Sequence, residues 1–312
     1  MNAQTEAIRA EARKLLETGE VSVVFGYGAG STPTRTTPVF VTHTDDVDQL
    51  IWSAGCSNNL ALYVRPAVKL GRVAIVAKSC DAAALVALIQ EKQVKREDLH
   101  IIGVPCRGVV DASKLPACGL DEGKIESVDT TGEQVSINGA NGTQTLNADQ
   151  VLKSACLGCD REAPALYDTL VGEPVQPRVQ PGKALPESIE ERRLFWAEAF
   201  DKCIRCMACR QVCPLCYCAT CFCDTASPSW VSKKIEPEEN WMYHTTRAMH
   251  MAGRCVGCGE CQRACPMGIP VGLMLRELGN EVWELFDYRS GVSLEESPAL
   301  GTFRDSDEGP KE

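Results

Sequence analysis

Two runs of cysteines in this chain share the spacing Cys-x-x-Cys-x-x-Cys-x-x-x-Cys-Pro. In this spacing three thiolates bind one 4Fe-4S cluster, and the fourth reaches the cluster of the other run. We therefore predict two clusters with crossed ligands, site 1 on Cys203, Cys206, Cys209 and Cys265, and site 2 on Cys255, Cys258, Cys261 and Cys213. Two zinc ribbons are the alternative, but a tetrahedral zinc site usually takes two Cys-x-x-Cys pairs and has no use for a third closely spaced cysteine.

Two further cysteines each follow a run of residues that is typical of a buried strand. Cys80 follows residues 73–77 and lies at the start of a predicted helix, and Cys106 follows residues 101–105. In a right-handed strand-helix-strand crossover both thiols emerge at the same edge of the sheet, where neighbouring strands are about 5 Å apart. The helix that starts at Asp81 points amide N–H groups at this edge, which lowers thiol pKa values and favours an anionic cluster.

A Cys-x-x-Cys pair, Cys156 and Cys159, would complete four ligands with Cys80 and Cys106. We refer to these four cysteines as site 3. The alternative is that Cys80 and Cys106 are small core residues, because most isolated cysteines behave in that way. Spacing alone leaves both interpretations open.

The segment CPLCYCATCFCD, between the two runs, packs four further cysteines together: Cys216, Cys218, Cys221 and Cys223. A two-cluster ferredoxin fold does not need them. We rank an additional iron-sulfur cluster first, with a zinc site and a partial exchange of ligands with the neighbouring cluster as alternatives. Nearby aromatic side chains would either shield such a site from water or serve in packing: Tyr217, Phe222 and Trp230.

Other patterns give weaker signals for chemistry. Residues 26–32, GYGAGST, are glycine-rich and follow a strand, but the residues after them do not predict the helix that a dinucleotide fingerprint requires. We expect a plain turn there rather than a flavin-binding loop. Cys56 and Cys118 have no partner at ligand spacing and are interpreted as structural. No catalytic residue is predicted, and the histidines, which show no zinc or triad spacing, are assigned surface or packing roles: His43, His100, His244 and His250.

The elements that position these cysteines alternate between strand-like and helical segments in the first half of the chain. We expect helices over residues 46–58 and 81–92, and strands over residues 21–25, 61–64, 73–77 and 101–105. Such alternation predicts an α/β domain with a mainly parallel sheet. Residues 121–150 alternate polar and apolar positions between Gly, Asn and Thr, which predicts a β-hairpin insertion.

Composition changes divide the chain into two domains and a tail. Residues 172–187 carry four prolines and read as a linker, so we place an α/β iron-sulfur domain at 1–182 and a helical, dicluster ferredoxin-like domain at 183–288. Ser188 and Glu191 form a capping box for a helix that leads into Cys203. Residues 289–312 are assigned to a tail.

Length, charge and cysteine content limit the class of protein. The chain has 312 residues, 18 cysteines and a formal net charge of -10. Its charged N-terminus lacks the apolar core of a signal peptide, so metal-bound thiolates in the cytoplasm are expected rather than disulfides. No apolar run reaches the roughly 18 residues of a membrane-spanning helix. An acidic protein repels phosphate backbones, which argues against a nucleic-acid partner.

Three segments together resemble the beta-subunit family of deazaflavin-dependent hydrogenases and dehydrogenases: KSCDAAALVALIQ, IIGVPCRG and SACLGCDREAPALYDTLVGE. The resemblance spans roughly residues 70–175. In that family these positions hold a 4Fe-4S cluster beside a flavin, so it implies site 3 as the ligand set and FAD on this chain or its partner. The family usually has its ferredoxin module ahead of this domain, whereas here the module follows, and the family's flavin-binding N-terminal region has no clear match here.

The whole chain, including RCMACRQVCPLCYC, is also similar to bacterial iron-sulfur subunits that accompany heterodisulfide-reductase-like complexes. This implies three 4Fe-4S clusters in a subunit of a multi-subunit complex of an anaerobe. Such a subunit would relay electrons between a redox partner (a flavoprotein, a formate dehydrogenase or a hydrogenase) and a heterodisulfide-reductase-like complex. The alternative is a self-contained flavoenzyme that oxidises reduced deazaflavin or NADH.

Overall fold

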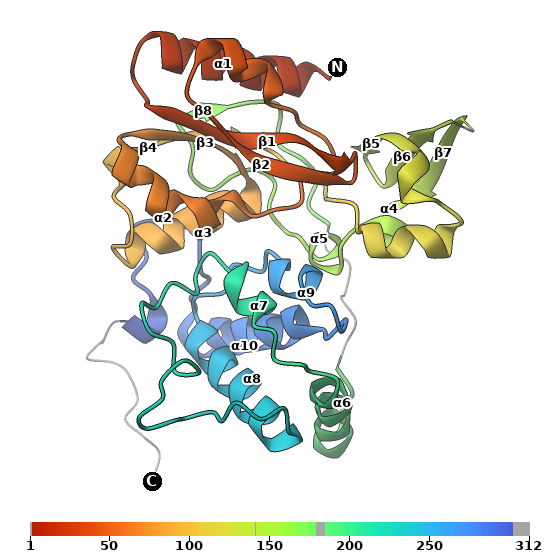
Figure 1. Cartoon of the computed structure of the whole chain (residues 1–312), viewed down its shortest axis with the longest axis vertical. Coiled ribbons are helices and arrows are strands. Elements are labelled where there is room, and N and C mark those ends of the chain that lie inside the picture. Colours follow the sequence, from red (N-terminus) through yellow and green to blue (C-terminus); the bar gives the residue numbers. More distant parts are fainter. Residues whose placement is uncertain (1, 141, 179–184, 302–312) are drawn as a thin grey trace.

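The computed structural model describes residues 2–140, 142–178 and 185–301. An α/β part, formed by the first half of the chain, lies against a helical part formed by the second half (Figure 1). The boundary that we expected between residues 182 and 183 lies outside the described residues, as do the last residues of the expected tail.

The α/β part is built on a five-stranded mixed sheet. Its order is β2-β1-β3-β4-β8, in which β1 and β2 are antiparallel and the other neighbours are parallel. Helices α1 (Ala3–Glu17) and α3 (Ser79–Gln90) lie on opposite faces of this sheet (Figure 1). The strands are β1 (Val23–Thr32), β2 (Arg35–Val41), β3 (Val73–Lys78), β4 (Leu99–Val104) and β8 (Thr169–Leu170).

The central strands have the composition of strands that are covered on both faces. Every residue of β3 and β4 is buried, which is why both read as continuous apolar runs rather than as alternating ones. The two strands are parallel, with Lys78 opposite Val104 at their carboxyl ends. This register brings the residues that follow each strand to one edge of the sheet.

Two of our element predictions in this part were wrong. Residues 61–64, expected as a strand, form a 3-10 turn (Leu60–Tyr63) and the start of α2 (Val64–Ala67), because the Asn59 side chain accepts a hydrogen bond from the Ala61 amide and caps a helical turn. Residues 46–58, expected as a helix, contain only a 3-10 turn (Thr44–Gln49). Beyond this turn the Asn2 side chain donates a hydrogen bond to the Trp52 carbonyl, and the Trp52 amide donates one to the Thr5 hydroxyl. These groups of Trp52 are therefore bound by the start of α1 and not within a helix.

The predicted hairpin insertion is a three-stranded antiparallel sheet with its own small core. Its strands are β5 (Ile125–Thr131), β6 (Gln134–Gly139) and β7 (Gly142–Asn147). Alternate residues of β5 and β6, such as Val128 and Ile137, are buried on one face. Two short helices, α4 (Ala148–Val151) and α5 (Ser154–Leu157), return the chain toward the helical part.

The helical part carries both cysteine runs. Ser188 caps α6 (Ile189–Asp201) as predicted, and its hydroxyl accepts a hydrogen bond from the Glu191 amide at 3.2 Å. Short helices follow within the runs, α7 (Ala208–Gln211) and α9 (Glu260–Arg263), and longer ones follow each run, α8 (Pro237–Met251) and α10 (Val271–Phe286). None of the helices in the described part of the chain has the length and apolar character that a membrane span requires.

Residues 289–301, which we assigned to the tail, contact both parts of the molecule. The Ser290 hydroxyl donates to the carbonyl of Arg254 at 2.9 Å, and the Gln90 side chain at the end of α3 donates to the carbonyl of Ser293 at 2.7 Å. Gly291 approaches Ala83 so closely that a Cβ would meet its carbonyl at 2.5 Å. This segment therefore packs on α3 in the contact between the two parts.

Candidate metal centres

Site 1 surrounds a small cavity in the helical part. The four cysteines that we predicted for it line this cavity together: Cys203, Cys206, Cys209 and Cys265. The Cys206 side chain is exposed, whereas Cys203 and Cys209 are buried. Backbone amides of Arg205 and Ile269 each donate to a cysteine sulfur of this set at 3.4 Å.

Two side chains of α8 also reach the sulfurs of site 1, and sequence reasoning missed both. The Tyr243 hydroxyl lies 3.4 Å from Cys209 Sγ, and His244 Nε2 lies 3.3 Å from Cys203 Sγ. His244 also stacks on Phe200, with 4.4 Å between ring centroids. Burial lowers the pKa of His244 to about 4, so its imidazole is neutral near pH 7. No sequence signal marks these residues, because the contacts join α8 to loops that are distant in sequence.

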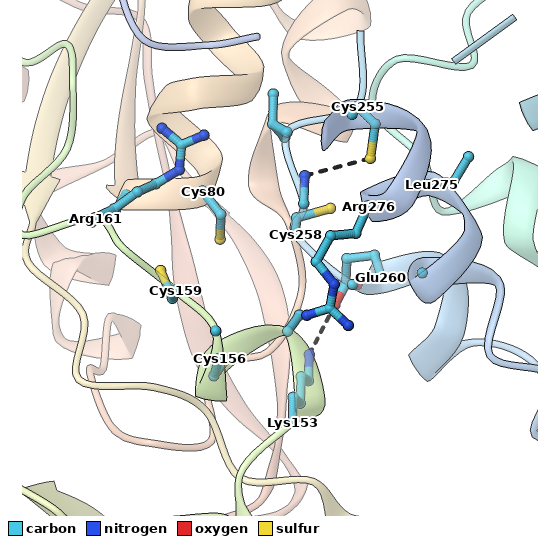
Figure 2. Close-up of a pocket in the computed structure, with 18 of the residues that line it drawn as sticks. Cys80, Lys153, Cys156, Cys159, Arg161, Cys255, Cys258, Glu260, Leu275 and Arg276 are labelled. Carbon is cyan, nitrogen blue, oxygen red and sulfur yellow. Dashed lines mark hydrogen bonds and ion pairs between the residues drawn. The ribbon is translucent and has the colours of Figure 1, made fainter. Parts of the chain in front are cut away.

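Sites 2 and 3 line one shared cavity of about 200 Å³ between the two parts of the molecule. Figure 2 shows Cys80, Cys156 and Cys159 on its α/β side and Cys255 and Cys258 on its helical side. All eight cysteines predicted for the two sites belong to the lining, which adds Cys106, Cys213 and Cys261. The structure thus brings together each predicted set of four.

The cysteines of site 3 reach the cavity from the carboxyl edge of the main sheet. Cys80 is the second residue of α3, directly after β3, and Cys106 follows β4. The Gly108 amide donates to Cys106 Sγ at 3.4 Å. Cys156 lies in the short helix α5, and Cys159 follows two residues after its end.

Burial dominates the acid-base behaviour of these thiols. It raises the pKa of Cys106 and of Cys258 to about 12, and it raises the pKa of Cys80 well above its usual value. A thiolate in this cavity therefore needs a cation to neutralise it. Four converging soft sulfur donors fit an iron-sulfur cluster, which would be held by the four cysteines of each set.

A buried polar network supports the start of α3 beside Cys80. Lys78 Nζ lies 2.9 Å from Asp81 Oδ2, and both side chains are almost fully buried. The Tyr27 hydroxyl donates to Asp81 at 3.0 Å and contacts the Lys78 ammonium. Lys78 lines the shared cavity, so it contributes a positive charge near site 3, which Asp81 offsets.

An ion pair crosses the shared cavity and joins the two parts of the molecule. Lys153 Nζ lies 2.9 Å from Glu260 Oε1, with side-chain exposures of 7% and 3% (Figure 2). Burial alone would raise the pKa of Glu260, but Lys153 and Arg263 lower it below its usual value. Gly259 permits this close approach, because it adopts a φ of +73° and a Cβ there would lie 2.6 Å from Ala155.

Removing one member of this pair should destabilise the protein. Lys153→Met keeps the aliphatic volume but leaves Glu260 buried with only Arg263, so we expect a loss of about 3 kcal/mol, near the lower end for a broken buried pair. The shift of the urea midpoint of the cluster-loaded protein measures this loss. Arg289→Met breaks the exposed inter-domain pair with Asp160 and should cost less than about 1 kcal/mol. Equal losses in the two variants would contradict the prediction.

The cysteine-rich segment does not gather around one point. Cys216 Sγ lies 3.8 Å from Met251 Sδ, and the Cys216 side chain also has a hydrogen bond with Cys213, a predicted ligand of site 2. Cys221 and Cys223 contact each other at 3.5 Å, beside the Arg210 guanidinium, and the Cys218 side chain is exposed. Among the described residues, no three Cys, His, Asp or Glu side chains lie close enough to share a single metal ion, either in this segment or at sites 1, 2 and 3. A 4Fe-4S cluster does not require this, because each of its four thiolates binds a different iron.

The glycine-rich residues and the remaining cysteines stand outside these cavities. Residues 26–32, expected as a turn, continue β1 as an extended strand, and β2 follows instead of a helix. Cys56 is fully buried in the core of the α/β part. Cys118 ends a 3-10 turn and is half-buried beside the carbonyl of Gln150.

Comparison with known proteins assigns families to both parts of the chain. Residues 70–185 match the model of the C terminus of the coenzyme F420 hydrogenase/dehydrogenase beta subunit, and residues 202–270 match a 4Fe-4S dicluster domain. The beta subunit of the F420-dependent formate dehydrogenase of Methanocaldococcus jannaschii is 21% identical, over 92% of this chain and 91% of its own length. The chain is homologous to these beta subunits.

Another beta subunit and one solved structure are also similar to this chain. The beta subunit of F420-dependent formate dehydrogenase 1 of Methanococcus maripaludis is 24% identical, over 95% of this chain and 92% of its own length. Alignments of this coverage span both matched regions of this chain. A chain of the F420-reducing NiFe hydrogenase complex of Methanosarcina barkeri is 14% identical, with a TM-score of 0.38 over 48% of this chain and 57% of that one.

Proposed function

We propose that this chain is the iron-sulfur electron-transfer subunit of a multi-subunit oxidoreductase, with three 4Fe-4S clusters at sites 1, 2 and 3. The observation that carries the proposal is the shared cavity, because sites 2 and 3 face each other across it from different parts of the molecule. Site 1 continues this series, since the helices α7 and α9 of the two cysteine runs contact each other. Its exposed Cys206 brings the series to the surface.

The relay would connect a donor and an acceptor on other subunits. Its relatives are named as beta subunits of F420-dependent formate dehydrogenases, which supports a formate dehydrogenase or hydrogenase as one partner. A heterodisulfide-reductase-like complex as the other partner rests on the sequence resemblance alone. Three of the charged groups that line the shared cavity act in structure: Lys153 and Glu260 bind each other, and Lys78 is bound to Asp81.

The test is the content and activity of the full chain, purified without oxygen. We expect about twelve irons and about twelve sulfides per chain, because three cubanes require them. The protein should exchange electrons with an artificial dye but convert no organic substrate. Zinc in place of iron, with no visible absorption band, would overturn the assignment of the clusters.

The self-contained flavoenzyme remains the second candidate, and the same preparation separates the two. One tightly bound FAD per chain, together with dye reduction that depends on reduced deazaflavin or NADH, would replace the relay by an enzyme. One observation favours this candidate: the basic side chain of Arg276, which a flavin phosphate could contact, lines the shared cavity (Figure 2).

A further inference from the structure

Site 1 differs from site 2 in the side chains that reach its sulfurs. Tyr243 and His244 of α8 are 1% and 3% exposed and contact Cys209 Sγ and Cys203 Sγ. A thiolate that ligates iron can only accept a hydrogen bond, so both side chains act as donors there. For His244 we assign the proton to Nε2, because Nδ1 is buried and has no hydrogen-bond partner among the described residues.

At site 2 the side-chain donor is weaker, because Cys213 has a hydrogen bond with the thiol of Cys216 and a thiol is a weak donor. Backbone amides reach two of its other sulfurs, Gly257 to Cys255 at 3.5 Å and Glu260 to Cys258. No hydroxyl or imidazole of the described residues reaches Cys255, Cys258 or Cys261. Arg247, also on α8, faces Cys213 and Cys261 of site 2 as well as Cys209 of site 1. Its charge therefore also raises the potential of site 2, and the effect that belongs to site 1 is that of Tyr243 and His244.

Hydrogen bonds to the sulfurs and contact with solvent both tune the potential of an iron-sulfur cluster. A donor stabilises the extra negative charge of the reduced cluster, and so does water. Site 1 has two side-chain donors and the exposed Cys206, whereas none of the four cysteines of site 2 is exposed. Both effects therefore act in the same direction.

We propose that the hydrogen bonds of Tyr243 and His244 raise the reduction potential of site 1, which favours an electron at the surface-exposed end of the relay. This inference rests on the proposed function and adds to it the residues that tune the cluster nearest Cys206. Tyr243 and His244 are positioning and tuning residues in this account, and they take no part in bond making.

The experiment is a redox titration of the full chain, followed by EPR, on three variants. Tyr243→Phe and His244→Phe each keep the ring and remove the donor, and each should move one reductive transition, the same one in both variants, to a more negative potential. Tyr63→Phe is the matched control: its ring packs edge-on against Phe40 and it lines neither cavity, so its transitions should match those of the wild type. No shift in either test variant, or equal shifts of all transitions, would overturn the inference.

Iron analysis of the same preparations separates this inference from the proposed function. About twelve irons per chain, with no shift of a transition in either variant, would overturn the tuning while leaving the proposed function intact. An iron content that excludes a cluster at site 1 would overturn both. His244→Phe keeps the inference testable if Tyr243→Phe fails to fold.

Discussion

Replacing Cys80 by serine should lower the iron content from about twelve to about eight per chain, because one cubane of three is lost. The serine oxygen is a poor ligand for a site built from soft thiolates, and Cys80 lines the shared cavity. Iron and sulfide analysis of the anaerobically purified protein measures the loss. EPR of the reduced protein should then lack one signal and keep the two of the ferredoxin-like part.

Cys56→Ser is the matched control for this variant. Cys56 is also fully buried in the α/β part, and burial raises the pKa of its thiol to about 11, but it lines neither cavity. It should therefore keep all of its iron. If Cys80→Ser also retained about twelve irons, Cys80 would be a core residue and site 3 would be misassigned. Loss of about eight irons instead of about four would mean that sites 2 and 3 assemble together.

The sequence was sufficient to predict which cysteines line the two cavities, because their positions follow from local rules. Within each run the spacing decides which thiols converge, and the ends of the adjacent parallel strands β3 and β4 decide that Cys80 and Cys106 share an edge. Each of these relations needs only nearby residues or one standard crossover. The composition of β3 and β4 was likewise sufficient to place the centre of the sheet.

What the sequence could not predict depends on how the two parts dock. The shared cavity exists because Lys153 binds Glu260 and because Gly259 approaches Ala155, and both are contacts between residues more than a hundred positions apart. The donors Tyr243 and His244 were missed for a related reason, since packing of α8 and not spacing brings them to the sulfurs. The error at residues 61–64 has a local cause. Their composition predicted a strand, but the Asn59 side chain caps a 3-10 turn there.

Exchange of the fourth ligands between the two runs predicts a crossed pattern of damage. Cys265 lines the cavity of site 1 with the cysteines of the first run, and Cys213 lines the shared cavity with those of the second. Cys265→Ser should therefore impair the cluster that the first run holds, and Cys213→Ser the cluster that the second run holds. Each variant should lose most of one EPR signal, because a cubane with three thiolates and one serine is labile.

Two uncrossed variants provide the reference spectra for this test. Cys206→Ser removes a ligand that belongs to site 1 in either pairing, and Cys258→Ser one that belongs to site 2. With exchanged ligands, the spectrum of Cys265→Ser resembles that of Cys206→Ser, and the spectrum of Cys213→Ser resembles that of Cys258→Ser. The reverse resemblance would mean that each run closes its own cluster. It would also require the two cavities to rearrange when iron binds, because Cys213 and Cys265 would have to exchange the positions that they occupy here.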